Sequence, residues 1–145
     1  MAVVVRRATP RDADDVLRLL AQLGRPEVAE DARPQGDVYL DHLVADDAAV
    51  FVADDLGRIA GVVSLWIRPR LNWTTPEAWI PDLYVAEESR RRGLARALLD
   101  ACVREARRRG CHRLVLESGH ERQAAHRLYE EYGFVHHGRA YGLRL

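Results

Sequence analysis

The chain has 145 residues, 48% of them hydrophobic and 30% charged, which is the balance of an ordinary globular domain. Basic and acidic residues number 22 each, and the zero net charge argues against a general binder of nucleic acids or anionic membranes. Every basic residue in that count is an arginine, so lysine Schiff-base chemistry and a phosphate-loop lysine are excluded. The length predicts a single domain spanning residues 1–145.

Three features bear on the location of the protein. The apolar stretch at the N-terminus is too short for the core of a signal peptide, and no segment is long enough to cross a bilayer. The two cysteines, Cys102 and Cys111, do not indicate a disulfide framework. We therefore expect a cytoplasmic protein with reduced thiols and no membrane association.

Apolar spacing and turn residues predict alternating strands and helices. In the first half we expect a strand at 3–5, a helix with apolar residues between Val16 and Leu23, a loop at 25–36, a weaker helix at 38–44 and a hairpin of strands 49–53 and 58–67. In the second half we expect a loop at 69–76, a strand at 79–85 interrupted by Pro81, a long helix at 94–109, a strand at 114–116, a helix at 123–132 and a final strand or hairpin at 134–145. This order predicts an α/β domain with a mixed sheet.

A basic turn joins the third long strand to the longest helix. Leu83-Tyr84-Val85 ends the strand, and after a short acidic loop comes Arg90-Arg91-Arg92-Gly93-Leu94-Ala95. The first amides of a helix lack partners within the helix, and the helix dipole adds partial positive charge there. Small residues let an anion approach the backbone, and arginines add charged contacts. The pattern predicts a pyrophosphate site, although such a turn alone is also typical of a solvated helix start.

These residues resemble the cofactor signature of the GNAT superfamily of N-acyltransferases, Arg/Gln-x-x-Gly-x-Gly/Ala after a strand with an aliphatic end. The resemblance implies a GNAT-like fold, with a central mixed sheet flanked by helices and strands that splay at the cofactor site. It also implies acetyl-CoA as co-substrate, with its pyrophosphate on the turn and its pantetheine arm along the strand. The cofactor-binding residues so implied are Leu83, Tyr84, Val85, Arg90, Arg91, Arg92, Gly93, Leu94 and Ala95.

A second motif resembles another signature of the same family, Ala-x-x-Leu/Phe-Tyr-x-x-x-Gly-Phe. Its residues here are Ala125, Leu128, Tyr129, Gly133 and Phe134. The resemblance implies that Tyr129 contacts the cofactor and is the catalytic acid, because a tyrosine hydroxyl can donate to the departing thiolate. The alternative is that Tyr129 only packs a helix, the role we expect for Tyr132. Arg122 stands where many members carry an asparagine against the cofactor, and we assign it to the cofactor site.

An alkylammonium acceptor must lose a proton before it can attack a thioester. The family often has Glu-Asp before the aliphatic strand end, and this chain has Pro81-Asp82. Asp82 is therefore the expected base or water-positioning group, with Glu77 and Glu117 as alternatives. Each of these could instead be an ordinary surface or hydrogen-bonded carboxylate. No metal site is expected, since the adjacent His136 and His137 would point to opposite faces of a strand.

The function that these features predict is N-acetyl transfer from acetyl-CoA to a primary amine of a small molecule or peptide, by direct attack. A non-catalytic acyl-CoA-binding regulatory module of the same fold is the alternative, because of the substitutions at Pro81 and Arg122. A nucleic-acid adaptor that uses the arginine clusters is a third class, and the zero net charge makes tight binding unexpected. The resemblance further suggests a homodimer.

Overall fold

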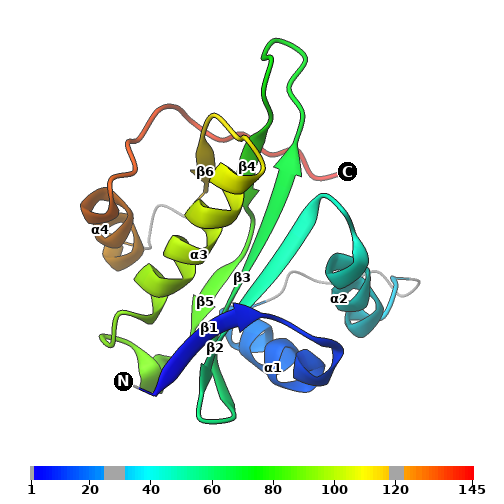
Figure 1. Ribbon diagram of the computed structural model, residues 1–145, viewed down its shortest axis with the longest axis vertical. Coiled ribbons are helices and arrows are strands. Elements are labelled where there is room, and N and C mark those ends of the chain that lie inside the picture. The colour runs from blue at the N-terminus through cyan, green and yellow to red at the C-terminus, as the bar shows by residue number, and fades with distance from the viewer. Residues whose placement is uncertain (1, 25–31, 118–122) are drawn as a thin grey trace. The chain divides into compact units, whose positions relative to one another are not determined.

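The computed structural model describes residues 2–24, 32–117 and 123–145 (Figure 1). The chain divides into two compact units, Met1–Val115 and Leu116–Leu145. The first unit holds almost the whole sheet and three of the helices, and the second holds the fourth helix and the C-terminal segment. That both units belong to a single domain stays a prediction.

In the part of the chain that the structure describes, the sheet has six strands. They are β1 (Val3–Arg7), β2 (Ala48–Asp55), β3 (Arg58–Arg68), β4 (Glu77–Ile80), β5 (Leu83–Val85) and β6 (Leu114–Leu116). The order across the sheet is β1-β2-β3-β4-β6, and β5 lies off this path and pairs with β3. Leu56 (φ 53°) and Gly57 (φ 93°) form the tight turn of the β2–β3 hairpin, where left-handed backbone matches the twist of the strands. The predicted α/β class with a mixed sheet is confirmed.

The described residues form four helices. They are α1 (Ala13–Leu23), α2 (Gln35–Val44), α3 (Leu94–Arg108) and α4 (Gln123–Tyr132), and short 3-10 turns occur at Pro10–Asp12 and Glu87–Ser89. All four were predicted, with ends displaced by a few residues at most. The largest displacement is the start of α2 at Gln35, inside the segment that we expected to be a loop.

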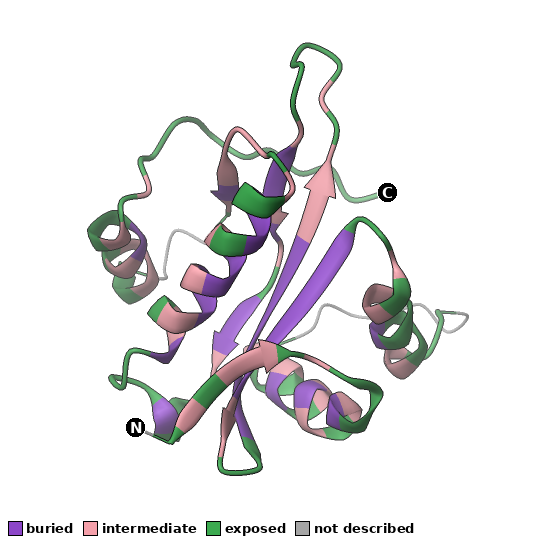
Figure 2. Cartoon of the chain, in the orientation of Figure 1, coloured by how far each residue is buried: buried purple, intermediate pink, exposed green. Residues whose placement is uncertain are grey.

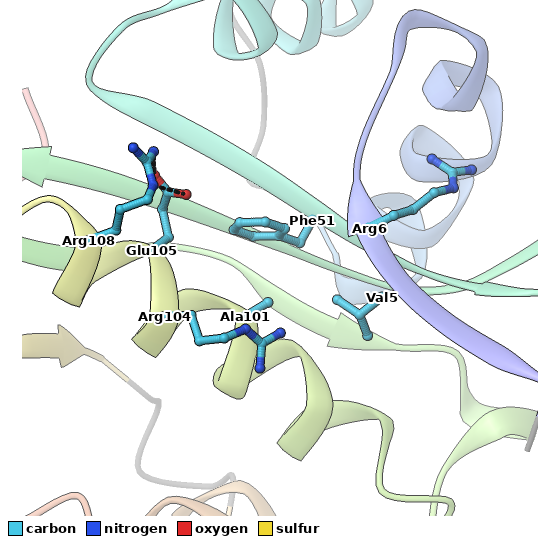
Figure 3. A pocket seen from close by; sticks show the side chains of 7 residues that line it. All are labelled: Val5, Arg6, Phe51, Ala101, Arg104, Glu105 and Arg108. Atoms are coloured by element: carbon cyan, nitrogen blue, oxygen red, sulfur yellow. Dashed lines mark hydrogen bonds and ion pairs between the residues drawn. The ribbon is translucent and has the colours of Figure 1, made fainter.

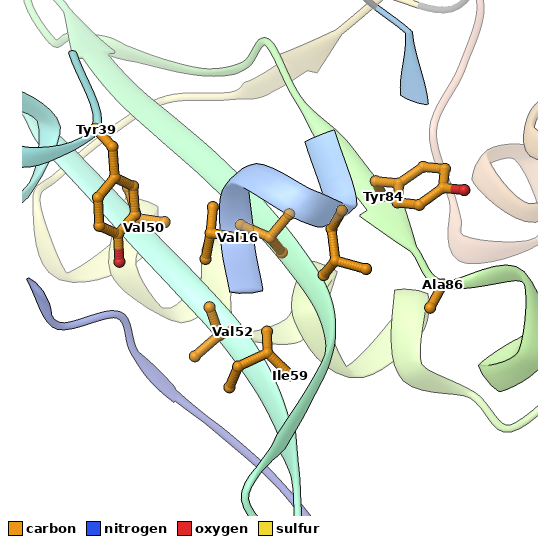
Figure 4. Close-up of a cluster of buried hydrophobic side chains, with 9 residues drawn as sticks. Val16, Tyr39, Val50, Val52, Ile59, Tyr84 and Ala86 are labelled. Atoms are coloured by element: carbon orange, nitrogen blue, oxygen red, sulfur yellow. The ribbon is translucent and has the colours of Figure 1, made fainter. Parts of the chain in front are cut away.

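The face of the sheet that α1 and α2 cover contains an apolar cluster. Its members include Val16 of α1, Tyr39 of α2, Val50 and Val52 of β2 and Tyr84 of β5 (Figure 4). Burial of such side chains contributes on the order of 2 kcal/mol each. The cluster therefore holds β5 against β3 and α1, even though β5 is only three residues long.

Helix α3 lies on the opposite face. Its apolar stripe, formed by Leu94, Leu98, Ala101, Cys102 and Ala106, is buried along its whole length (Figure 2). Gly61 of β3 lets the helix approach closely, because a Cβ atom there would lie 3.1 Å from Leu98 Cδ1 and 3.3 Å from the carbonyl oxygen of Tyr84. Gly61 thus sets the spacing between α3, β3 and β5, which is where the predicted site lies.

One strand prediction is confirmed and another is wrong. The strand expected at 79–85 with an interruption at Pro81 is indeed divided into β4 and β5, because Pro81 has no N–H to donate to the ladder and the chain bulges there. The expected strand or hairpin at 134–145 is wrong, since these residues form no helix or strand. Most of that segment is exposed, Val135, Tyr141 and Leu143 included, so its apolar residues find no core face against which a strand could form.

Candidate functional site

The break between β4 and β5 is a one-residue bulge against β3. Trp79 of β4 lies opposite Trp66, and Leu83 of β5 lies opposite Val63. Between these two pairs, residues 64 and 65 of β3 lie opposite three residues, 80–82, of the neighbouring chain segment. The N–H of Ser64 still donates to the carbonyl oxygen of Asp82, at 2.9 Å. The bulge redirects the chain without detaching it from β3.

Beyond the bulge, β5 has one paired edge and one open edge. It pairs with β3, and among the described residues no strand pairs with its other side. The carbonyl of Asp82 and the N–H of Ala86 both point toward β3, where Ala86 donates to Ala60 at 2.8 Å. The N–H and C=O groups of successive residues alternate between the two edges of a strand. The backbone groups of Tyr84 therefore also point toward β3, whereas those of Leu83 and Val85 point away from it. The open edge thus presents backbone groups of Leu83 and Val85, and the backbone of Tyr84 is used in the sheet.

The turn that follows leads into an uncapped helix. Arg91 (φ 64°) and Gly93 (φ 76°) are both in the left-handed region, which is uncommon for a residue other than glycine. Gly93 is the N-cap of α3, and no side chain caps the helix by a hydrogen bond. The helical ladder begins with the bond from the Ala97 N–H to the Gly93 carbonyl, at 3.1 Å. The amides of Leu94 and Ala95 therefore have no acceptor within the helix, which makes this end receptive to an anion.

The three arginines of the turn differ in their contacts. Arg90 donates from Nε to the Val85 carbonyl at 3.2 Å, and its guanidinium lies over the Tyr84 ring, 5.4 Å from the centroid. Arg92 pairs with Asp55 of the hairpin at 2.9 Å. Arg91 is exposed. Arg90 and Arg92 thus tie the turn to β5 and to the β2–β3 hairpin, while all three keep positive charge near the start of α3.

Asp82 is exposed at the bulge, and a hydrogen bond from the sheet orients it. The Oγ of Ser64 donates to Asp82 Oδ2 at 3.2 Å. Ser64 was missed in the sequence, although it is the one polar residue in the apolar run 59–67 and that signal could have identified it. The two residues place an accessible carboxylate directly before β5.

Glu77, the alternative base, lies in a different setting. It is 1% exposed, and its carboxylate accepts hydrogen bonds from Arg68, Arg70 and Arg113 at 2.7–3.0 Å. Burial alone raises the pKa of Glu77, but the bonds from the three arginines outweigh it and lower the pKa to about 2. A carboxylate so stabilised as an anion is a poor proton acceptor, so the structure favours Asp82 over Glu77.

The second motif lies in the C-terminal unit. The Tyr129 ring packs edge-to-face on Phe134, 5.9 Å between centroids, and the Tyr129 carbonyl accepts from the N–H groups of Gly133 and Phe134. Gly133 (φ 122°) ends α4 there. The catalytic role of Tyr129 stays a prediction. Glu117 is exposed in the same unit, and Arg122 lies outside the described residues.

A separate pocket lies beside α3, away from these residues. Its lining includes Phe51 of β2 and Arg104, Glu105 and Arg108 of α3 (Figure 3). Glu105 is buried and pairs with Arg7, Arg108 and Arg109. None of the predicted site residues lines this pocket.

Two further properties concern metals and membranes. Within residues 2–24, 32–117 and 123–145, no group of three or more His, Cys, Asp or Glu side chains could hold a metal ion. No helix in this part of the chain combines the length and the apolar character that a membrane span requires.

The fold and the site geometry define an acyltransferase-like domain in which a strand edge and a helix start meet. The family model "Acetyltransferase (GNAT) family" matches residues 15–134, and the chain belongs to this family. It is therefore an acetyltransferase enzyme, and enzymes of the family use acetyl-CoA. No curated protein matches the sequence.

Solved structures agree with this assignment. An acetyltransferase from Agrobacterium tumefaciens str. C58 is 28% identical with a TM-score of 0.86, and the match covers 98% of this chain and 99% of the other. A Trypanosoma brucei acetyltransferase is 26% identical with a TM-score of 0.82, with 99% of both chains covered. An aminoglycoside N-acetyltransferase in complex with CoA shares the fold at 21% identity and a TM-score of 0.81, over 98% of both chains.

Proposed function

We propose that the protein transfers the acetyl group of acetyl-CoA to a primary amine, and that CoA binds where β5 meets α3. The observation that carries the proposal is the open edge of β5 beside an uncapped helix start. Leu83 and Val85 offer backbone groups along the edge to an amide-containing arm. Leu94 and Ala95 offer amides to a diphosphate, at the positive end of the helix dipole.

The residues present fit this ligand. Gly93 caps the helix without a side chain of its own, so an oxyanion can reach the first amides. Arg90, Arg91 and Arg92 supply positive charge at the turn, and guanidinium groups can bind phosphate oxygens in pairs. The fold neighbour that contains CoA gives further support. When bound, acetyl-CoA supplies an activated acyl group as a thioester.

The chain's own residues supply the proton transfers. Asp82, oriented by Ser64, accepts a proton from the acceptor ammonium, directly or through a water molecule. The neutral amine then attacks the acyl carbon directly. Tyr129 donates a hydrogen bond from its hydroxyl to the departing sulfur and stabilises the developing negative charge there. Because a thiol (pKa ~8.5) is a stronger acid than a phenol (pKa ~10), the sulfur can leave as a thiolate held by this bond. No covalent bond to the protein forms.

Thiol release from acetyl-CoA over a panel of primary amines tests the proposal. Amine-dependent release is expected, and an inactive protein that still binds CoA would favour the regulatory module instead. Initial rates with both substrates varied should give intersecting double-reciprocal lines, because both bind before the chemistry. Parallel lines would indicate an acyl-enzyme and would contradict direct attack.

Tyr129→Phe tests the acid, with Tyr132→Phe as the matched control in the same helix. We expect Tyr129→Phe to lower kcat by about 100-fold with little change in KM for acetyl-CoA, since it removes a proton donor from the transition state. Tyr132→Phe should change kcat by less than about threefold. Equal effects of the two substitutions would remove Tyr129 from the mechanism.

A further inference from the structure

One cluster near the site has an excess of charge that its structural role does not explain. Glu77 of β4 accepts four hydrogen bonds from Arg68, Arg70 and Arg113, which fill both carboxylate oxygens. One arginine would balance the charge, so the cluster retains two positive charges in excess. Among the described residues, Glu77 is the only carboxylate paired with these arginines.

The arginines are fixed on one side and open on the other. Glu77 is 1% exposed, whereas the side chains of Arg68, Arg70 and Arg113 are 41%, 34% and 38% exposed. Arg68 and Arg113 each use Nε toward Glu77, and Arg70 uses one terminal nitrogen. The remaining N–H groups are not needed by Glu77, and the buried carboxylate holds the three guanidinium groups in place. Guanidinium groups fixed in this way bind an oxyanion at little cost in conformational entropy.

The cluster lies on the same face of the sheet as Asp82. Arg68, Trp66 and Ser64 alternate along β3, so their side chains share one face. Trp79 lies opposite Trp66, and the Arg68 guanidinium lies over its ring, 4.8 Å from the centroid. Ser64 marks the other end of the row by its bond to Asp82.

These residues form a row that runs from Asp82 and Ser64 through Trp66 and Trp79 to Arg68. The row is less buried toward its arginine end. Figure 2 shows β3 changing from buried to intermediate toward its C-terminal end. Four residues of strand separate Ser64 from Arg68, roughly 13 Å. The row therefore offers a carboxylate at one end, half-buried tryptophans between, and a positive cluster at the other end.

We propose that the acceptor is an anionic amine, whose carboxylate or phosphate group binds Arg68, Arg70 and Arg113 while its amine reaches Asp82. This inference rests on the proposed function for the role of Asp82. The two ends of the row select for opposite charges, an ammonium and an oxyanion. His42 of α2 packs against Trp66 and Arg68 covers one face of Trp79, so an apolar linker would contact the parts of these half-buried rings that remain exposed. Its length is set by the separation of the two ends.

Calorimetry without acetyl-CoA tests the inference independently of turnover. The probes are ω-aminocarboxylates of increasing length, the aminoalkyl phosphate monoesters of the same lengths, and the corresponding alkylamines. We expect the anionic amines to bind about tenfold more tightly than the alkylamines, as charge-assisted hydrogen bonds permit. Whichever anionic series binds more tightly identifies the oxyanion.

Arg70→Gln should weaken that preference, because it lowers the excess of the cluster from two positive charges to one. Arg70 lies in the β3–β4 loop, and without it Glu77 keeps two arginines. Arg104→Gln is the matched control, an exposed arginine of α3 on the opposite face. Thermal unfolding of each variant verifies folding. Equal affinity for alkylamines and anionic amines, or an equal loss in both variants, would overturn the inference.

Thiol release with the same amines separates this inference from the proposed function. If anionic amines bind through Arg70 but no amine is acetylated, the anion site stands and acetyl transfer fails. If amines are acetylated with the same KM whether or not they carry an anionic group, acetyl transfer stands and the anion site fails.

Discussion

Strands β4 and β5 are separated by only two residues, yet they differ in their pairing and in the contacts of their polar groups. β4 pairs with β3 on one side and lies next to β6 on the other, and its Glu77 is saturated by three arginines. β5 pairs with β3 alone among the described strands, and the helix start beside it has no capping side chain. The bulge at Pro81 and Asp82 separates a strand with satisfied polar groups from one with available polar groups.

This difference indicates where stability and function reside. Changes in β4 should affect unfolding, because they expose buried polar groups that have partners only in the folded state. Changes at the bulge, in β5 and in the turn should affect ligands and turnover, because the amides of Leu83 and Val85 face away from β3 and those of Leu94 and Ala95 have no acceptor within the helix. Four predictions test this separation.

The largest effect is expected for Asp82→Asn, which removes the proposed base at the bulge. We expect kcat/KM to fall by about 100- to 10,000-fold, the usual contribution of a general base, with the free energy of unfolding almost unchanged because Asp82 is exposed. Steady-state kinetics and urea unfolding measure the two quantities. Asp41→Asn, an exposed acid on α2, is the control that should alter neither. Full activity of Asp82→Asn would transfer the base role elsewhere.

The converse effect is expected for Glu77→Gln in β4. Removing this charge leaves three arginines with no carboxylate and a buried amide that cannot accept the same bonds. We expect a loss of about 3 kcal/mol in the free energy of unfolding, the lower end for a broken buried ion pair, since the arginines can rehydrate. Urea unfolding measures it. A loss below that of a surface pair, under about 1 kcal/mol, would contradict the structural role of β4.

Acid should lower the stability of the protein through Glu77 and Glu105, which are both buried. Burial raises the pKa of Glu105, but hydrogen bonds from Arg109 and Arg108 outweigh it and lower the pKa to about 2, as for Glu77. Both groups therefore stabilise the fold above a pH of about 4.5, and this contribution is lost as the pH falls toward about 2. Urea unfolding across this range measures how steeply the free energy of unfolding falls with pH. We expect the fall to be shallower in Glu77→Gln than in the parent protein, by up to about 1 kcal/mol per pH unit. Identical slopes would show that Glu77 is not held as an anion.

A smaller effect is expected for Gly61→Ala, where α3 approaches β3 and β5. The new Cβ would lie 3.1 Å from Leu98 Cδ1 and 3.3 Å from the Tyr84 carbonyl oxygen, so helix and strand must separate slightly. We expect a loss of about 1 kcal/mol in stability and weaker CoA binding, measured by urea unfolding and calorimetry. Gly138→Ala, where a Cβ meets nothing within 4 Å, is the control. If Gly61→Ala is destabilised but binds CoA with unchanged affinity, the spacing between α3 and the two strands does not determine CoA binding.

The sequence predicted the parts of this fold that depend on local pattern. The apolar stripe of α3 and the interruption at Pro81 follow from spacing and from the missing N–H of proline. The left-handed Gly93 before α3 fits the sequence position assigned to an anion site. In contrast, residues 134–145 have strand-like composition but lack a partner, and pairing is a tertiary property that composition cannot give.

The site was predicted less completely than the fold. Asp82 could be selected as a carboxylate before a strand, but the reason to reject Glu77 is its three arginines, which come from β3, the following loop and the residue before β6. These contacts join positions up to 36 residues apart, and no spacing rule connects them. Likewise, which backbone groups of β5 face outward depends on its register with β3, which the sequence alone does not set.

Amide hydrogen exchange with and without CoA tests the central claim most directly, because it reads β4 and β5 in one experiment. The account predicts that CoA slows exchange at Leu83 and Val85 on the open edge and at Leu94 and Ala95 at the helix start. Exchange at Ala78 of β4, whose N–H already donates to the Arg113 carbonyl at 2.9 Å, should stay unchanged. Saturating CoA with no added protection at β5 or at the start of α3 would contradict the account.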